Sequence, residues 1–131
     1  MLVRSEEERT LVGKAGENST VWDSPSPKFI MGGSDEDKFD HPTQKPVDLM
    51  RRPILNHLRR GELVYDPFLG SGTTLAAAEL AERVCYGLEL DPKYVDVIVQ
   101  RWQVLSDKKA ILEGDGRTFE EIAQERTKEA A

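Results

Sequence analysis

The sequence predicts an α/β domain in which about three parallel strands are flanked by helices. Short apolar runs of strand length alternate with helical patterns along residues 41–131, and glycine turns or helix caps separate them. Strands that alternate with helices favour a parallel sheet. Each helix forms a right-handed crossover, which returns the chain to the end of the sheet where the previous strand began.

The first expected helix begins at Pro46, since the missing N–H group of proline costs nothing at the first helical position. Pro53 lies inside the element and predicts a kink or a break, and Gly61 is expected to end it. Apolar residues that recur at helical spacing define its buried side: Val47, Met50, Ile54 and Leu58.

The apolar runs predict three strands, at residues 63–66, 84–89 and 110–112. A helix is expected over residues 72–83, between the first two strands. Asp91 and Pro92 then provide an N-cap and a first helical residue. One apolar stripe follows on that helix: Val95, Ile98, Val99, Trp102 and Leu105. Thr118 is expected to cap a last helix that extends to about Glu129.

The domain organisation expected from composition is an irregular tail or linker over residues 1–40 and one domain over residues 41–131. The first segment contains Ser24-Pro25-Ser26-Pro27 and Gly32-Gly33, which do not support long elements. No apolar run approaches the roughly 20 residues that cross a bilayer, so no membrane partner is expected. The single cysteine, Cys85, excludes an internal disulfide, and the cytoplasm is the expected compartment. The cysteine and the two histidines have no zinc-site spacing, so no metal is expected.

Charge is distributed unevenly along the chain. The net charge of −6 argues against general affinity for nucleic acid. Residues 41–60, however, carry five basic side chains and one acidic one, a local net charge of +4. The arginines at 51, 52, 59 and 60 could contact phosphate, or they could form a solvated helix face. The sequence leaves both readings open.

The most informative segment is the glycine turn Asp66-Pro67-Phe68-Leu69-Gly70-Ser71-Gly72-Thr73-Thr74, between the first strand and its helix. Glycines permit close backbone approach to a ligand, and the first N–H groups of the helix point toward it. Glu89 follows Asp66 by 23 positions, at the expected end of the second strand. An acid at this place accepts hydrogen bonds from ribose in Rossmann-like sites. The combination predicts a nucleotide-like ligand.

The turn differs from two common phosphate motifs. Leu75 stands where a dinucleotide fingerprint has its third glycine, and no Gly-Lys-Ser/Thr follows. Asp66 would repel a pyrophosphate but would suit a cationic or amino-bearing ligand. S-adenosylmethionine carries a sulfonium and an α-amino group, so charge favours it over NAD as the cofactor.

Three strings in this order resemble consecutive motifs of the DNA amino-methyltransferases of the permuted β type: His41-Pro42-Thr43-Gln44-Lys45-Pro46, Asp66–Thr74, and Gly87-Leu88-Glu89-Leu90-Asp91-Pro92-Lys93-Tyr94. The resemblance covers about residues 20–122 and implies a partial Rossmann-like methyltransferase fold that binds S-adenosylmethionine. The family methylates exocyclic amines of adenine or cytosine in DNA, in restriction-modification among other settings.

The resemblance also assigns roles to residues. It implies that Thr43, Gln44 and Lys45 flank the methionine end of the cofactor. Glu89 would hold the ribose, Leu90 and Asp91 would lie beside the adenine, and Asp115 matches a weaker position near the adenine amino group. For Asp115, an ordinary Asp-Gly turn is an equally good interpretation. The cofactor loop would consist of Asp66, Phe68, Gly70, Ser71, Gly72 and Thr73.

One departure from the family pattern concerns catalysis. Members carry an Asp/Asn/Ser-Pro-Pro-Tyr type motif that grips the flipped target amine, and this sequence contains no Pro-Pro pair. No catalytic residue is therefore assigned. In the permuted order, this motif and the target-recognition region precede the His41–Pro46 string. The chain thus resembles the C-terminal, cofactor-binding half of such an enzyme, and residues 1–40 would end the upstream half.

Three functions remain from the sequence. The chain could be the cofactor half of a DNA methyltransferase that acts on DNA with a second polypeptide supplying the catalytic motif and target recognition. It could be a non-catalytic remnant or regulatory module that still binds S-adenosylmethionine. It could also be an unrelated small α/β nucleotide binder.

Overall fold

The computed structural model describes residues 21–22 and 45–129 of the 131 in the chain. Within these residues the order is helix α1 (Val47–His57), strand β1 (Leu63–Asp66), helix α2 (Thr73–Leu80), strand β2 (Val84–Gly87), helix α3 (Pro92–Ser106) and helix α4 (Phe119–Glu129). The α/β class expected from the sequence is confirmed. The division expected after residue 40 lies outside the described residues.

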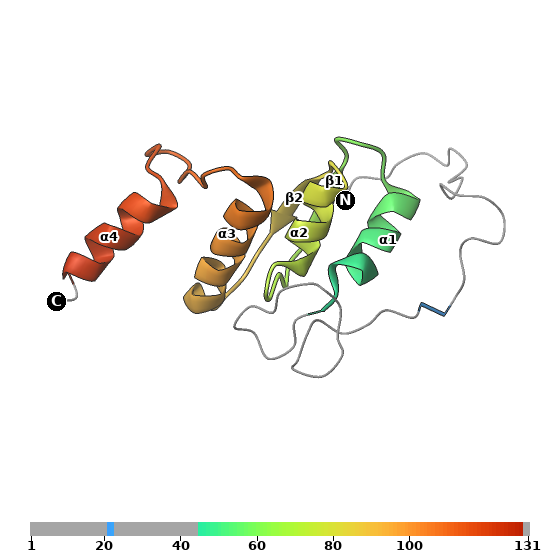
Figure 1. Ribbon diagram of the computed structural model, residues 1–131, viewed down its shortest axis with the longest axis horizontal. Coiled ribbons are helices and arrows are strands. Elements are labelled where there is room, and N and C mark those ends of the chain that lie inside the picture. Colours follow the sequence, from blue (N-terminus) through green and yellow to red (C-terminus); the bar gives the residue numbers. More distant parts are fainter. Residues whose placement is uncertain (1–20, 23–44, 130–131) are drawn as a thin grey trace.

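The sheet consists of β1 and β2, which pair in parallel with Leu63 opposite Val84 and Asp66 opposite Gly87. Helix α2 connects them, so the unit is the expected βαβ crossover. In Figure 1, α2 lies between α1 and α3, and it contacts both helices as well as β2.

The core lies between α1, α2 and one face of the sheet. Its buried members are mostly small, because α2 and its C-cap residue present Ala77, Ala78 and Ala81 to Ile54 of α1. Alanines allow the two helices to approach closely and have the highest helix propensity. Val64 of β1 and Cys85 of β2 contact this cluster from the sheet.

Half-burial affects the chemistry of Cys85. Desolvation, helped by the negative charge of Asp66, raises the pKa of the thiol to about 11. The thiol is therefore protonated at neutral pH, which makes it a poor nucleophile.

The opposite face of the sheet remains exposed, although its residues are equally apolar. Strand residues alternate in burial along β1, as they must when helices cover one face only. Tyr65 and Tyr86 are 61% and 62% exposed, and Leu63, Val84 and Leu88 are exposed beside them. Parallel sheets are ordinarily covered on both faces, so this face is unusual for its sheet type.

The sequence predicts a kink or a break at Pro53. No break occurs, because α1 runs as one helix from Val47 to His57. Only one backbone hydrogen bond is lost at a proline, and Ile54, next to it, is buried in the core. Helix α2 is also shorter than residues 72–83, because Glu82 adopts a positive φ of 58° before β2 begins.

The third strand expected at residues 110–112 does not form. These residues instead pair locally across the Gly114–Gly116 turn: Leu112 N donates to Arg117 O at 2.8 Å, and Phe119 N donates to Ala110 O at 3.0 Å. Ile111 and Thr118 make one isolated antiparallel bridge. The backbone hydrogen-bonding groups of this short apolar run are thus paired within its own loop. The run does not pair with β2 as a third strand.

Candidate cofactor-binding site

The two loops that follow β1 and β2 meet at one edge of the sheet. Because the strands are paired in register, the chain leaves both of them at the same level. Leu88 N donates to Asp66 O at 2.9 Å, and Leu69 N donates to Leu88 O at 2.9 Å. The segments that carry the expected cofactor residues are therefore joined by backbone hydrogen bonds.

Asp66 fixes the beginning of the first loop. One carboxylate oxygen accepts from Phe68 N at 3.0 Å, and the other accepts from Thr74 Oγ1 at 2.6 Å. The side chain thus connects the end of β1 to the first turn of α2. This arrangement holds a half-buried carboxylate beside the glycine turn.

Both glycines of the turn adopt the left-handed conformation. Gly70 has a φ of 56° and Gly72 has a φ of 77°, values that side chains of L-residues rarely permit. Gly72 is also the N-cap of α2, and it provides no side-chain capping bond. A Cβ atom there would lie 3.2 Å from the side chain of Ile98, so the turn also lets α2 approach α3.

Glu89 links the two loops through its carboxylate. One oxygen accepts from Gly70 N at 2.8 Å, and the other accepts from Leu90 N at 2.9 Å and Asp91 N at 3.0 Å. Glu89 is thus a structural element of the turn as well as the expected ribose ligand.

The rim of this edge combines apolar and polar side chains. Phe68 is 86% exposed and Leu90 is 98% exposed, one in each loop. Asp91 caps α3 as expected, with its carboxylate accepting from Lys93 N at 2.9 Å. The described part of the edge therefore offers two exposed apolar surfaces, a set of carboxylates and the N-terminus of α2.

The His41–Pro46 string is only partly described. Thr43 and Gln44 lie outside the described residues. Lys45 is described, and its carbonyl oxygen accepts from Thr73 Oγ1 at 3.2 Å. At least the end of this string therefore contacts the glycine turn.

Asp115 is held differently from the other expected site residues. Its carboxylate accepts from Arg117 N at 2.8 Å and forms an ion pair with the Arg117 guanidinium at 2.6 Å. These bonds lower the pKa of the Asp115 carboxyl. The contacts described for Asp115 lie within its own turn, and none joins it to Glu89 or the glycine turn. Its place near the cofactor stays a prediction.

Sequence reasoning missed Arg101, the one charged residue that is buried among the described residues, at 5% exposure. Its guanidinium donates to Ser71 O at 3.0 Å and to Thr73 Oγ1 at 3.2 Å. The spacing could have indicated its burial. Arg101 follows Ile98, a residue of the predicted apolar stripe, by three positions and so lies on the same face of the helix.

The basic stretch that could contact phosphate is partly engaged within the chain. Arg52 lies over the Trp22 ring at 5.5 Å from its centroid, and Arg60 pairs with Glu82 at 3.1 Å on the exposed surface. Exposed pairs of this kind contribute little to stability. Neither contact decides between a phosphate contact and a solvated face.

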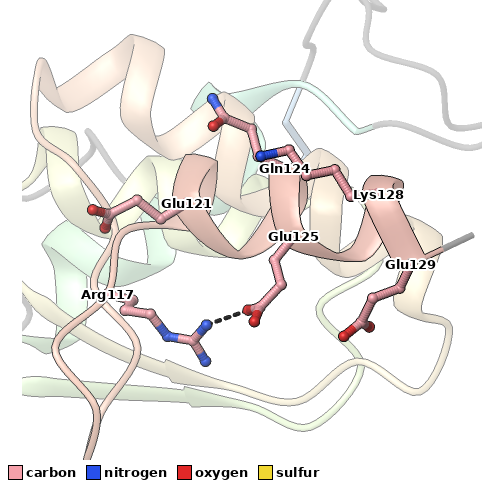
Figure 2. Close-up of a pocket in the computed structure, with 6 residues that line it drawn as sticks. All are labelled: Arg117, Glu121, Gln124, Glu125, Lys128 and Glu129. Carbon is pink, nitrogen blue, oxygen red and sulfur yellow. Dashed lines mark hydrogen bonds and ion pairs between the residues drawn. The ribbon is translucent and has the colours of Figure 1, made fainter.

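A shallow hollow lies on α4 and the turn that precedes it (Figure 2). It lies away from the glycine turn, and charged side chains of both signs line it. Arg117 points toward Glu125 and forms an ion pair with it. Opposite charges that pair with one another in open solvent are a weak basis for binding a ligand. We therefore place the candidate site at the sheet edge. The described residues contain no cluster of three or more His, Cys, Asp and Glu side chains that could hold a metal ion.

A βαβ unit with a glycine turn and an acid at the end of the second strand defines a Rossmann-like nucleotide-binding fold. Comparison with family models identifies the family: residues 4–100 match the model of the DNA methylases of the N6/N4 type. The chain belongs to this family, and its fold is that of a methyltransferase in part.

Individual relatives agree with this membership. The chain is 38% identical over 90 residues to the DNA adenine methyltransferase YhdJ of Escherichia coli K12, covering 69% of this chain and 29% of the relative. It is 33% identical over 86 residues to the type II methyltransferase M2.MboI of Moraxella bovis, covering 66% and 30%. The chain thus spans about a third of the length of these curated relatives.

A solved structure gives the same result for the fold. The chain is similar to M1.HpyAVI in its complex with SAM, with a TM-score of 0.54 and 32% identity, over 70% of this chain and 43% of that one. The fold expected from the resemblance, a partial methyltransferase fold, is confirmed by this similarity. No helix among the described residues is long and apolar enough to cross a membrane.

Proposed function

We propose that this chain is the cofactor-binding portion of a site-specific DNA methyltransferase that uses S-adenosylmethionine to methylate an exocyclic amine of adenine or cytosine. It would correspond to the C-terminal half of a permuted β-type enzyme. Family membership and the names of the relatives, DNA adenine and type II methyltransferases, support this assignment. DNA is the proposed partner of the complete enzyme.

The main observation behind the proposal is that Glu89 joins the loop after β2 to the glycine turn. Gly70 N donates a hydrogen bond to the Glu89 carboxylate, with 2.8 Å between the two atoms, at the edge where both strands end. These residue types fit the cofactor: the carboxylates of Asp66 and Glu89 suit a cationic ligand with ribose hydroxyls, and exposed Phe68 and Leu90 suit an adenine ring.

The proposed contacts follow the sequence expectations. Glu89 holds the ribose, Leu90 and Asp91 lie beside the adenine, and Asp115 is a weaker contact to the adenine amino group. Thr43, Gln44 and Lys45 flank the methionine end. The loop itself comprises Asp66, Phe68, Gly70, Ser71, Gly72 and Thr73. The bound cofactor would supply an activated methyl group, while the residues of this chain bind and orient it.

We further propose that a second polypeptide supplies the catalytic motif and target recognition, because this sequence contains no Pro-Pro pair. The exposed apolar face around Tyr65 and Tyr86 supports a covering partner. Within the described residues, β1 also has no neighbouring strand on the side away from β2. A strand whose backbone is unpaired along one side favours the addition of a strand from another chain.

The partner surface can be tested with matched substitutions on the two sheet faces. Tyr65→Lys and Tyr86→Lys should reduce self-association or partner capture while the chain stays folded, since these side chains contact mainly solvent. Val64→Lys, on the covered face, should unfold the chain because it buries an unpaired charge. Light scattering and circular dichroism separate these results. Unfolding by Tyr65→Lys would contradict the assignment of that face as an open docking surface.

The cofactor assignment can be tested by ultraviolet cross-linking of methyl-labelled S-adenosylmethionine to the purified chain. We expect labelling that unlabelled S-adenosylmethionine suppresses and NAD does not. The same preparation should transfer no methyl group to unmethylated DNA, because it lacks the motif that grips the target amine. Labelling that NAD suppresses equally would overturn the cofactor proposal, and transfer by the chain alone would overturn the need for a second polypeptide.

A further inference from the structure

Arg101 is an unexpected residue to find inside a small domain. Its side chain reaches from the middle of α3 into the space behind the glycine turn and is 5% exposed. Removing a guanidinium from water is costly unless hydrogen bonds replace those of water. The contacts around Arg101 therefore have to be favourable for this residue to stay buried.

The contacts converge on one part of the turn. A single guanidinium nitrogen donates to Ser71 O at 3.0 Å and to Thr73 Oγ1 at 3.2 Å. Thr73 Oγ1 donates in turn to Lys45 O at 3.2 Å and lies 3.3 Å from Ser71 Oγ. Ser71 and Thr73 are themselves buried. One small polar network thus joins three segments that are distant in the sequence.

The network constrains Gly72, one of the two glycines of the turn. A fixed Ser71 carbonyl fixes the peptide plane before Gly72 and α2 fixes the chain after it, so the left-handed φ of 77° is constrained from both sides. Glycine has the largest conformational freedom to lose when it is ordered. A turn that is already ordered binds its ligand without that loss, because preorganisation lowers the cost of association.

We infer that Arg101 is a positioning residue that preorganises the Ser71–Thr73 turn, and through Thr73 the end of the His41–Pro46 string, for cofactor binding. This inference rests on the proposed function of the turn. Arg101 acts through the backbone that it anchors and not by contact with the cofactor. Its permanently charged guanidinium is more weakly hydrated than a lysine ammonium, so it is better suited to making these bonds in a buried position.

The test compares Arg101→Met with Trp102→Phe. The first removes the donors and keeps an unbranched stem. The second is a matched control on the same helix, since it removes the Trp102 Nε1 bond to Glu79, 3.2 Å long, which does not reach the turn. Calorimetry with S-adenosylmethionine and thermal unfolding are measured for both variants, together with Arg101→Lys.

We expect Arg101→Met to weaken S-adenosylmethionine binding by at least about tenfold, the effect of one lost bond to a charged donor. Trp102→Phe should lower the unfolding temperature and change the affinity by less than about twofold, because it leaves the turn intact. Arg101→Lys should recover part of the affinity. Unchanged affinity in folded Arg101→Met, or losses that merely follow stability in both variants, would overturn the inference.

Amide hydrogen exchange separates this inference from the proposed function. Gly70 N and Gly72 N both donate hydrogen bonds in the free chain, so their exchange reports opening of the turn. Without any cofactor, both amides should exchange faster in Arg101→Met or Arg101→Lys than in Trp102→Phe. If the wild-type chain fails to bind S-adenosylmethionine, the proposed function fails, while this exchange pattern still decides whether Arg101 orders the turn. Equal exchange in all variants would refute it.

Discussion

The sheet edge at Asp66–Asp91 and the segment from Asp107 to Glu129 both carry residues expected at the cofactor, and they are held together in opposite ways. At the sheet edge, hydrogen bonds join residues that are far apart in sequence, as Gly70 joins Glu89. In the second region Asp115 is bound by Arg117, two residues away, and α4 has no buried residue.

Figure 1 shows the same contrast in space. Helices α1, α2 and α3 lie side by side, whereas the chain leads away from them after α3 to reach α4. The candidate site therefore lies where segments that are distant in sequence are joined by hydrogen bonds. A motif residue whose contacts stay within its own turn, such as Asp115, is a weaker candidate for the site.

The largest effect is expected at Glu89. Glu89→Ala should weaken S-adenosylmethionine binding by about 1–3 kcal/mol, the scale of a lost hydrogen bond to a charged group. Calorimetry measures the change. Glu121→Ala, in the second region, is the control and should leave the affinity unchanged. Equal losses in the two variants would abolish the distinction between the regions.

The next effect compares two glycines with the same φ of 77°, Gly72 and Gly116. Alanine in the left-handed conformation should cost about 1–2 kcal/mol of unfolding free energy at either position. Gly72→Ala should cost more, because its Cβ would also press on Ile98, whereas nothing lies within 4 Å at Gly116.

Urea unfolding gives the stability of both glycine variants, and cofactor titration completes the comparison. Gly72→Ala should lose far more affinity than Gly116→Ala, since only the turn at Gly72 lies at the sheet edge. A loss in Gly116→Ala as large as that in Gly72→Ala would give the second region equal weight in the site.

A smaller effect is expected at the cap of α4. Thr118 Oγ1 accepts from Glu121 N at 3.3 Å, and Glu121 accepts from Thr118 N at 2.7 Å, which is a capping box. Thr118→Ala should cost about 1 kcal/mol of helix stability. Circular dichroism would show reduced helicity, while cofactor binding should not change.

The same cap predicts a pH dependence. The hydrogen bonds from Thr118 lower the pKa of Glu121 in the folded helix. A carboxyl whose folded pKa is depressed stabilises the fold above its unfolded pKa, and that contribution is lost as the pH falls through the folded pKa. Helix α4 should therefore fray on acidification below the ordinary glutamate range. In Thr118→Ala this acid sensitivity should be smaller, and an unchanged acid transition would contradict the role of the cap.

The smallest effect is expected at Asp115. Asp115→Asn should weaken S-adenosylmethionine binding by only about twofold to fivefold, as for one neutral hydrogen bond, because Arg117 already engages its carboxylate. Titration of this variant beside Glu89→Ala measures the ratio. An effect at Asp115 as large as that at Glu89 would show that the segment after α3 closes over the site.

Local signals in the sequence were sufficient for the elements that surround the site. The apolar run at β1, Leu63–Asp66, and the Asp91–Pro92 start of α3 are both found where they were predicted. Each depends on neighbouring residues only. That Glu89 would lie near the glycine turn was also predictable, because parallel strands have their carboxyl ends at one edge of the sheet.

What could not be predicted depends on tertiary contacts. Arg101 is a charged residue in a helix, and no local pattern states that it is buried behind the turn. The run at residues 110–112 has the composition of a strand, but hydrogen bonds to Arg117 and Phe119 satisfy it locally. Pro53 is tolerated because its helix is packed against α2. At Arg101 and Pro53 packing overrides the local preference, whereas at residues 110–112 the hydrogen bonds of a local turn do so.

Calorimetric titration of the purified chain with S-adenosylmethionine, beside an identical titration with NAD, tests the proposed cofactor site directly. The glycine turn and the carboxylates of Asp66 and Glu89 predict saturable binding of S-adenosylmethionine at one site and none of NAD. A chain that is folded by circular dichroism, yet binds neither ligand or binds NAD as tightly, would contradict the account.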